Sequence, residues 1–301
     1  MICAIFFPST GIVLEPYLLL WLGLLLFVNL IGLNPKDLLA NFSQPRNVIV
    51  MSLLKLFILP LSVYAITSLI YPKLTLSATL LSGISTALGA PFAINFIGRG
   101  SLALLVGVII VTSIAVPFTL PAIVYILFGH QITVPIFNMM SLLAAGILIP
   151  LFVGWLVTRT AQTLASSINK NSLIFSLILV ALVNLSVFGK FSSYFFMEPE
   201  FIIELLVAVF LLFCLHCAAG YYYDTLLIMI GKKSNSREKM CNNKPNTKID
   251  RITGLIAMTY ISNVFVVVIA KQFFEVPTEA LAAFYQIPYY AGLLILRKFF
   301  S

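Results

Sequence analysis

Charged side chains are scarce in this sequence. Asp, Glu, Lys and Arg make up 9% of the 301 residues, whereas hydrophobic residues make up 61% and the mean hydropathy is +1.07. A soluble domain carries about 25% charged residues, so the composition excludes a soluble globular protein and indicates an integral membrane protein. Segments of about ten residues with alternating polarity, the pattern of a membrane β-barrel, do not occur either.

Candidate catalytic and metal-binding groups are also few. The chain has two histidines, His130 in a predicted loop and His216 in an apolar segment, and neither has an acidic partner within sequence reach. Cys214 and Cys217 flank His216 in the sequence CLHC, but two cysteines do not supply the ligand set of a structural zinc site. We therefore expect no enzymatic activity, no metal centre and no cofactor. The basic residues show no nucleic-acid footprint.

The rest of the chain consists of apolar segments of the length that crosses a bilayer as a helix, about 17–25 residues. The predicted spans are 17–33, 47–71, 75–98, 101–129, 134–158, 172–189, 201–223, 252–273 and 278–296. The first residues, MICAIFFP, look like the end of another helix whose beginning is missing. We expect an all-α membrane protein with about nine full transmembrane helices and a partial first helix.

The lysines and arginines predict one orientation in the membrane. If the 34–46 loop faces the cytoplasm, alternation places most of them on that side, including those of the long basic loop 232–251 and of the C-terminus. The residues that fall on the outer side are Lys73, Lys190 and Lys271. We expect a multi-pass protein of the cell membrane, with loop 232–251 and the C-terminus in the cytoplasm and membrane lipids around it.

Two of the predicted spans are interrupted. In 75–98 the helical stretch LTLSATLLSGISTA is followed by Gly89, Ala90 and Pro91. Proline removes a backbone donor and clashes with the preceding turn, while glycine lets the chain bend, so we expect a break there. An ordinary proline kink is the alternative. Segment 252–273 carries a polar cluster at its centre, formed by Thr259, Tyr260, Ser262 and Asn263.

The two interrupted spans occupy the same place in each half of the chain. Residues 1–130 and 131–301 are therefore predicted to be two repeats of inverted topology, the second containing loop 232–251. Interrupted segments at matching positions of inverted repeats indicate a transporter with its site near the bilayer midplane.

These features resemble the bile acid:sodium symporter family. The matching stretches are LKLFILP at 54–60, GAPFAINFIGRGSLAL at 89–104 and TYISNVFVVVIAKQFFEVP at 259–277, in the order found in the family. The resemblance implies a panel domain, a core domain in which two broken helices cross, and a small organic, bile-acid-like anion as the substrate.

The positions that bind sodium in coupled members of this family are largely changed. By resemblance, the oxygen-bearing side chains of the family fall on apolar residues here, namely Ala90, Pro91, Phe92, Leu105, Ile109, Ala257 and Ile261. A hard cation requires oxygen ligands, so sodium coupling is doubtful on this resemblance.

Lys55 falls on the glutamine that helps to bind sodium in the family. One interpretation is snorkelling, in which the long side chain reaches the inner headgroups. The other is that the ammonium occupies the place of a sodium ion and exchanges a coupling proton, because burial favours the neutral amine.

The sequence therefore predicts a secondary transporter of a small organic anion. The candidate substrate- or ion-binding residues are Lys55, Thr86, Gly89, Ala90, Pro91, Phe92, Asn95, Thr259, Tyr260, Ser262 and Asn263. Further residues that could line a path are Asn184, Ser186, Tyr285, Gln286 and Tyr289. Two alternatives stay open: a proton-linked exporter of the auxin-carrier type, and a non-transporting membrane scaffold or receptor.

Overall fold

The structure is a computed structural model, and it describes residues 6, 8–31, 45–87, 89–130, 135–191, 199–223 and 247–300. Helices occupy nearly all of these residues, as expected for an all-α protein. In chain order they are α2 (Pro8–Leu14), η1 (Glu15–Tyr17), α3 (Leu18–Ile31), α5 (Pro45–Leu53), η3 (Leu54–Ile58), α6 (Leu59–Ile70), η4 (Pro72–Leu74), α7 (Thr75–Gly83), α8 (Ala90–Ile97), α9 (Leu102–Phe128), α10 (Ile136–Thr160), α11 (Gln162–Lys170), α12 (Ser172–Lys190), α14 (Pro199–Tyr221), α16 (Thr247–Thr259), α17 (Asn263–Phe273), α18 (Val276–Phe284) and α19 (Gln286–Phe300).

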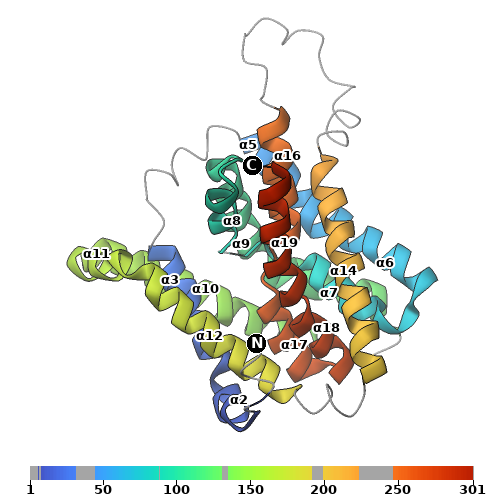
Figure 1. Ribbon diagram of the computed structural model, residues 1–301. Coiled ribbons are helices and arrows are strands. Elements are labelled where there is room, and N and C mark those ends of the chain that lie inside the picture. Colours follow the sequence, from blue (N-terminus) through green and yellow to red (C-terminus); the bar gives the residue numbers. More distant parts are fainter. Residues whose placement is uncertain are drawn as a thin grey trace, which may run out of the picture.

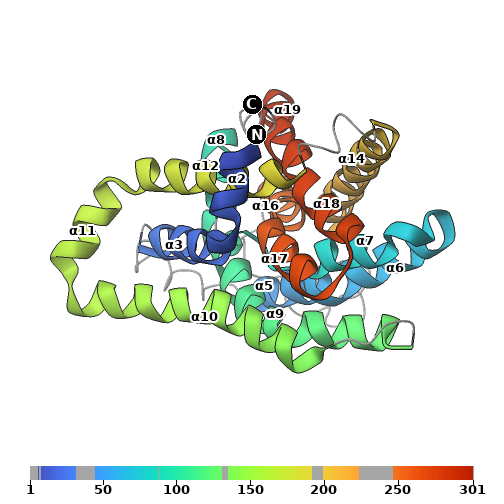
Figure 2. The same ribbon diagram turned by 90° about the horizontal axis from the view of Figure 1, so that it is seen from below.

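The helices form two groups that lie side by side (Figures 1 and 2). In the smaller group, α3 packs against α10 and α12, α2 packs against α12, and α11 joins α10 to α12 at the outer edge. The larger group contains α5 to α9, α14 and α16 to α19, with α14 against α16 and α6 against α7. Helices α9 and α10 connect the groups, and α17 touches both α3 and α10.

Five helices of the described residues are long and apolar enough to cross a membrane. They span Pro8–Asn29, Pro45–Ile70, Leu102–Phe128, Ile136–Thr160 and Glu200–Tyr221, and the bent pair Gln162–Lys170 and Ile174–Gly189 would make a sixth. The all-α membrane fold is thus confirmed, whereas the predicted count of about nine full crossings is not.

The predicted partial first helix lies partly outside the described residues. From Pro8 onward the chain is helical, and α2 continues through η1 into α3. Gly11 of α2 rests on Gly189 of α12, where a Cβ atom on Gly189 would come within 2.7 Å of the Gly11 Cα. The absence of side chains at both positions lets the two backbones touch.

The predicted break in 75–98 exists but begins earlier than the sequence indicates. Helix α7 ends at Gly83, and Ile84 already has extended dihedral angles (φ −71°, ψ 158°). Pro91 does not end a helix, because it lies in the first turn of α8, where the missing N–H removes no helical hydrogen bond. Gly89 therefore lies in the break as predicted, whereas the predicted helical stretch through Ala87 extends about one helical turn beyond the observed end of α7.

The second interruption lies where the polar cluster predicts it. Helix α16 ends at Thr259 and α17 begins at Asn263, so Tyr260, Ile261 and Ser262 form the break. The helices on either side are buried in the larger group.

Candidate functional site

The two breaks meet inside the larger helix group and pair with each other. The Ala87 amide donates to the Tyr260 carbonyl at 2.8 Å, and the Ser262 amide donates to the Ser85 carbonyl at 3.0 Å. Thr86 and Ile261 thereby form an isolated antiparallel β-bridge between the two breaks. The pairing satisfies backbone groups that the breaks release, which is necessary in a protein interior surrounded by lipid.

Threonine side chains reinforce this crossing. Thr86 is fully buried and its hydroxyl donates to the Ala257 carbonyl at 2.8 Å, while its amide reaches the Thr112 hydroxyl of α9 at 3.4 Å. Thr259 is also buried, and its hydroxyl donates to the Leu255 carbonyl of its own helix. The crossing is therefore held by hydrogen bonds from three elements and not by apolar packing alone.

Lys55 lies beside this crossing. It belongs to η3, a π-helical turn, and its side chain is 0% exposed. Its Nζ donates to the Ser82 carbonyl at 3.0 Å and lies 3.5 Å from the Met258 carbonyl. These carbonyls belong to the last turns of α7 and α16, where the partial negative charge of a helix dipole suits a cation. A snorkelling side chain would reach outward, so the structure contradicts that interpretation of Lys55.

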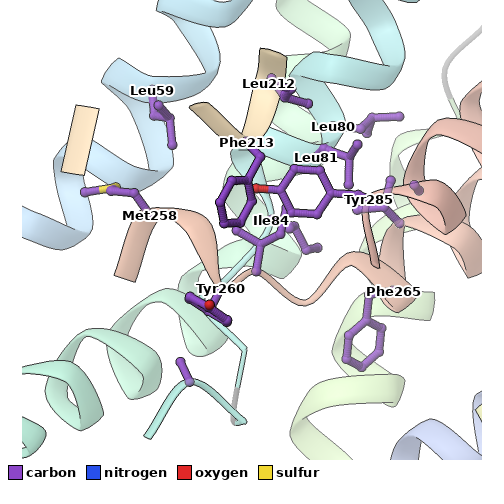
Figure 3. Close-up of a cluster of buried hydrophobic side chains, with 14 of the residues drawn as sticks. Leu59, Leu80, Leu81, Ile84, Leu212, Phe213, Met258, Tyr260, Phe265 and Tyr285 are labelled. Carbon is purple, nitrogen blue, oxygen red and sulfur yellow. The ribbon is translucent and has the colours of Figure 1, made fainter. Parts of the chain in front are cut away.

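A second buried group, His216 of α14, lies on the other side of Ser82. Its Nε2 is 2.9 Å from the Ser82 hydroxyl, and its Nδ1 is 2.8 Å from the Tyr285 hydroxyl. The Tyr285 hydroxyl lies 3.1 Å from the Thr259 carbonyl, at the start of the second break. Figure 3 shows Tyr285 in the apolar cluster beside Phe213, Leu81 and Ile84, which closes this region to water.

A cavity of about 410 Å³ lies between the crossing and the smaller helix group. Its walls come from α3, α12, both breaks, α17 and α19, and the described residues that line it are uncharged. The polar ones are Asn29, Ser172, Ser176, Asn184, Ser262, Asn263, Gln286, Tyr289 and Tyr290. Gly89 immediately precedes the half-helix α8, Asn263 is the first residue of the half-helix α17, and both line the cavity. The positive dipole ends of these two helices therefore face the cavity.

The predicted site residues do not all lie together. Ala87 and Gly89 of the first break and Phe92 of α8 line the cavity. Ser262 of the second break and Asn263 at the start of α17 line it as well. Ala90 is buried and Pro91 is half-buried at the start of α8, whereas Asn95 is exposed and is not among the cavity-lining residues. Tyr260 is buried with its ring against Tyr289, at 4.6 Å between the centroids.

Among the additional path residues, Asn184, Gln286 and Tyr289 line the cavity. Ser186 does not line the cavity, and its hydroxyl donates to the Leu182 carbonyl of α12. Sequence reasoning did not single out Ser82 at all and found no partner for His216. Their contacts join residues 134 positions apart in the chain, so no local pattern could reveal them.

Four of the positions aligned with sodium ligands are apolar and packed in the core, whereas Phe92 is exposed. Leu105, Ile109 and Ala257 are 0% exposed and Ile261 is 1% exposed, all within the hydrophobic core. At these four aligned positions the side chains therefore offer no oxygen ligand, and the cation at the crossing is the ammonium group of Lys55, which contacts main-chain carbonyls.

Apolar helices, two broken helices that pair in the interior and a cavity beside the pairing define a membrane transporter. A sequence model described as the sodium bile acid symporter family matches residues 19–198, more than half of the chain. The chain belongs to this family of membrane transporters. The match contains Lys55 and the first break. Among curated proteins, none matches the chain in sequence.

Proposed function

We propose that this protein is a secondary transporter that moves a small organic anion through the cavity beside the crossing, with Lys55 in place of a coupling sodium ion. The substrate part of the proposal is supported by the cavity itself. Its volume of about 410 Å³ suits a small organic molecule, and its lining is apolar with a few polar groups. The N-terminal ends of α8 and α17 supply the positive field that favours a carboxylate.

The observation that carries the coupling part is the Lys55 ammonium at 3.0 Å from the Ser82 carbonyl. A sodium ion needs several oxygen ligands to replace its water, and Leu105, Ile109 and Ala257 offer none from their side chains. A fixed ammonium needs fewer acceptors, and the last turns of α7 and α16 provide two. Transport should therefore be independent of sodium and sensitive to pH.

The test is uptake of labelled taurocholate and cholate into proteoliposomes that contain the purified protein. Replacing sodium with potassium should not change the rate, whereas an imposed pH gradient should change it. Lys55→Gln removes the amine that exchanges the proton and should change the pH response, and Lys55→Arg should keep the charge and slow turnover, because a guanidinium does not release its proton.

The matched control is Lys271→Gln. Lys271 is a lysine of the broken helix α17, but it is 39% exposed and pairs with Glu15 at 3.0 Å, away from the crossing. This variant should retain the pH response. Uptake driven by a sodium gradient would overturn the coupling proposal. Protein that moves neither probe under any gradient would overturn the proposed substrate class, and the scaffold alternative would gain support.

A further inference from the structure

The further inference concerns His216, which the transport proposal above does not use. Its ring is 0% exposed, and both ring nitrogens contact hydroxyl groups, Ser82 at 2.9 Å and Tyr285 at 2.8 Å. Each hydroxyl also lies within hydrogen-bonding distance of a carbonyl: Ser82 Oγ is 2.7 Å from the Ala78 oxygen, and the Tyr285 oxygen is 3.1 Å from that of Thr259.

The protons in this network can be counted. Each hydroxyl has one proton, which goes either to its carbonyl or to the ring. When both hydroxyls donate to carbonyls, both ring nitrogens must donate to the hydroxyl oxygens, and the histidine is an imidazolium with every hydrogen bond made. When the ring is neutral, one hydroxyl must turn its proton toward it. The same heavy-atom positions thus accommodate a neutral and a protonated His216.

Lys55 constrains which of these states occurs. It donates to the main-chain oxygen of Ser82, the residue whose side chain meets His216. The groups that contact these two side chains are hydroxyls and carbonyls, and none of them carries a negative charge. Two uncompensated cations in one buried region are strongly unfavourable. Lys55 and His216 together are therefore stable with one positive charge between them, and not with two.

We propose that Lys55 and His216 form one shared proton-binding site, in which a single proton resides either on the lysine or on the histidine. When the proton leaves the ammonium, Lys55 becomes a neutral amine that can still donate to the Ser82 carbonyl. When the imidazole takes it up, Ser82 and Tyr285 turn their protons to Ala78 and Thr259. The total charge stays at one positive unit in both states. This inference rests on the proposed function, because it extends the coupling site from Lys55 to His216.

Among the described residues, the titratable groups that interact with Tyr285 are phenols and thiols, and the buried carboxyl group of Glu279 lies on α18, which packs against α7 and α14. Tyr285 comes from the junction of α18 and α19, Tyr260 from the second break, and Cys214 and Cys217 from the same helix as His216. Phenols and thiols are neutral near pH 7 when they are buried. They can relay or hold hydrogen bonds, but Lys55 and His216 are the groups here that carry the exchangeable positive charge.

The inference is tested by nitrogen-15 NMR of histidine-labelled protein in lipid nanodiscs. The sequence has two histidines, and His130 lies exposed just after the end of α9, so it provides a second histidine signal for comparison. At about pH 6, close to where a free histidine titrates, His216 should be neutral in the unmodified protein. In Lys55→Met the proton should move to the ring, and the imidazolium fraction of His216 should rise at least about tenfold, equivalent to one pH unit.

Two further variants complete the experiment. Lys55→Gln keeps a donor for the Ser82 carbonyl and should give the same imidazolium signal if Lys55→Met does not fold. Lys271→Met should leave the His216 signal unchanged. A His216 that remains neutral in both Lys55 variants would overturn the shared site.

Uptake measurements separate this inference from the proposed function. His216→Gln removes the titrating ring and should flatten the pH dependence of taurocholate uptake. Uptake that depends on Lys55 and pH, together with an unchanged His216 spectrum, would overturn the shared site and leave the transport proposal standing. If uptake does not depend on pH but His216 becomes protonated in Lys55→Met as expected, the shared site would be supported and its use in coupling would be overturned.

Discussion

At the residue scale, a buried lysine needs acceptors, and the ends of two broken helices supply them. Lys55 could be placed deep in a helix from sequence because the apolar residues around it are continuous. The hydrogen-bond acceptors of Lys55 could not be identified from the sequence, since Ser82 and Met258 are 27 and 203 positions away. The same holds for His216, whose hydroxyl partners come from α7 and from the junction of α18 and α19. Residue type and depth were readable, but long-range hydrogen bonds were not.

Ser82→Ala provides a test of the buried network at this scale. The variant removes the hydroxyl that meets His216 Nε2 and leaves a buried ring nitrogen without that partner. Such a loss costs about 1–3 kcal/mol, so the variant should unfold at a lower temperature in detergent.

Ser62→Ala is the matched control for this prediction. The Ser62 hydroxyl also bonds a carbonyl four residues earlier, at 2.7 Å from Ile58, but Ser62 is exposed. Its replacement should change stability by no more than about 0.5 kcal/mol. Equal melting temperatures for the two variants would mean that the contact of Ser82 with His216 adds no stability.

At the element scale, the breaks show how tertiary pairing overrides a local signal. Gly89 and Pro91 predict an interruption, but residues 84–87 leave the helix earlier because they pair with Tyr260 and Ser262. The pairing partner lies in the other half of the sequence, so the true end of α7 at Gly83 was not readable from its own segment. The second break was readable, since its polar cluster marks the gap between α16 and α17 directly.

The contact of α14 with α16 gives a prediction for these elements. Gly220 and Gly254 bring the two helices together, and a Cβ on Gly254 would lie 2.5 Å from the Gly220 carbonyl oxygen and would clash with the Tyr223 ring. Gly254→Ala should separate the helix that carries His216 from the helix that carries Thr259. Overpacking of this kind costs about 1–3 kcal/mol, measurable as a lower melting temperature.

Gly23→Ala in α3 serves as the control. A Cβ there would meet the nearest atom, Pro150 Cγ, at 3.5 Å, which is an ordinary contact. This variant should keep or slightly raise stability, because alanine is the better helix former by about 1 kcal/mol. If Gly254→Ala were as stable as Gly23→Ala, the close approach of α14 and α16 would not be needed.

At the scale of the whole molecule, the C-terminal end of α19, which carries Arg297 and Lys298, meets the end of α8. The Arg297 guanidinium lies 4.5 Å above the Phe96 ring, and the Ser101 amide donates to the Thr253 hydroxyl at 2.7 Å. These contacts join the end of α8 to the end of α19 and the start of α9 to the middle of α16, and Figure 1 shows the start of α5 at the same end as the C-terminus. Lys271 pairs with Glu15 elsewhere, on the helices that the sequence assigns to the outer side.

This arrangement agrees with the positive-inside pattern, but the side that faces the cytoplasm stays a prediction, as does the division into inverted repeats. Family, helical class and the need for a break were predictable, because they depend on composition and on glycine and proline positions. The cavity was not, since its walls come from segments as distant as α3 and α19.

The orientation can be tested with cysteine labelling of intact cells. Cys241 lies in the basic loop 232–251, which we expect in the cytoplasm, and His130 lies in a predicted outer loop. With Cys3, Cys214 and Cys217 replaced by serine, a membrane-impermeant maleimide should label a His130→Cys variant in intact cells. Cys241 should be labelled only after the membrane is permeabilised, because positively charged loops are retained in the cytoplasm. The reverse pattern would invert the molecule in the membrane, and the end at which Arg297 meets Phe96 would then face outward.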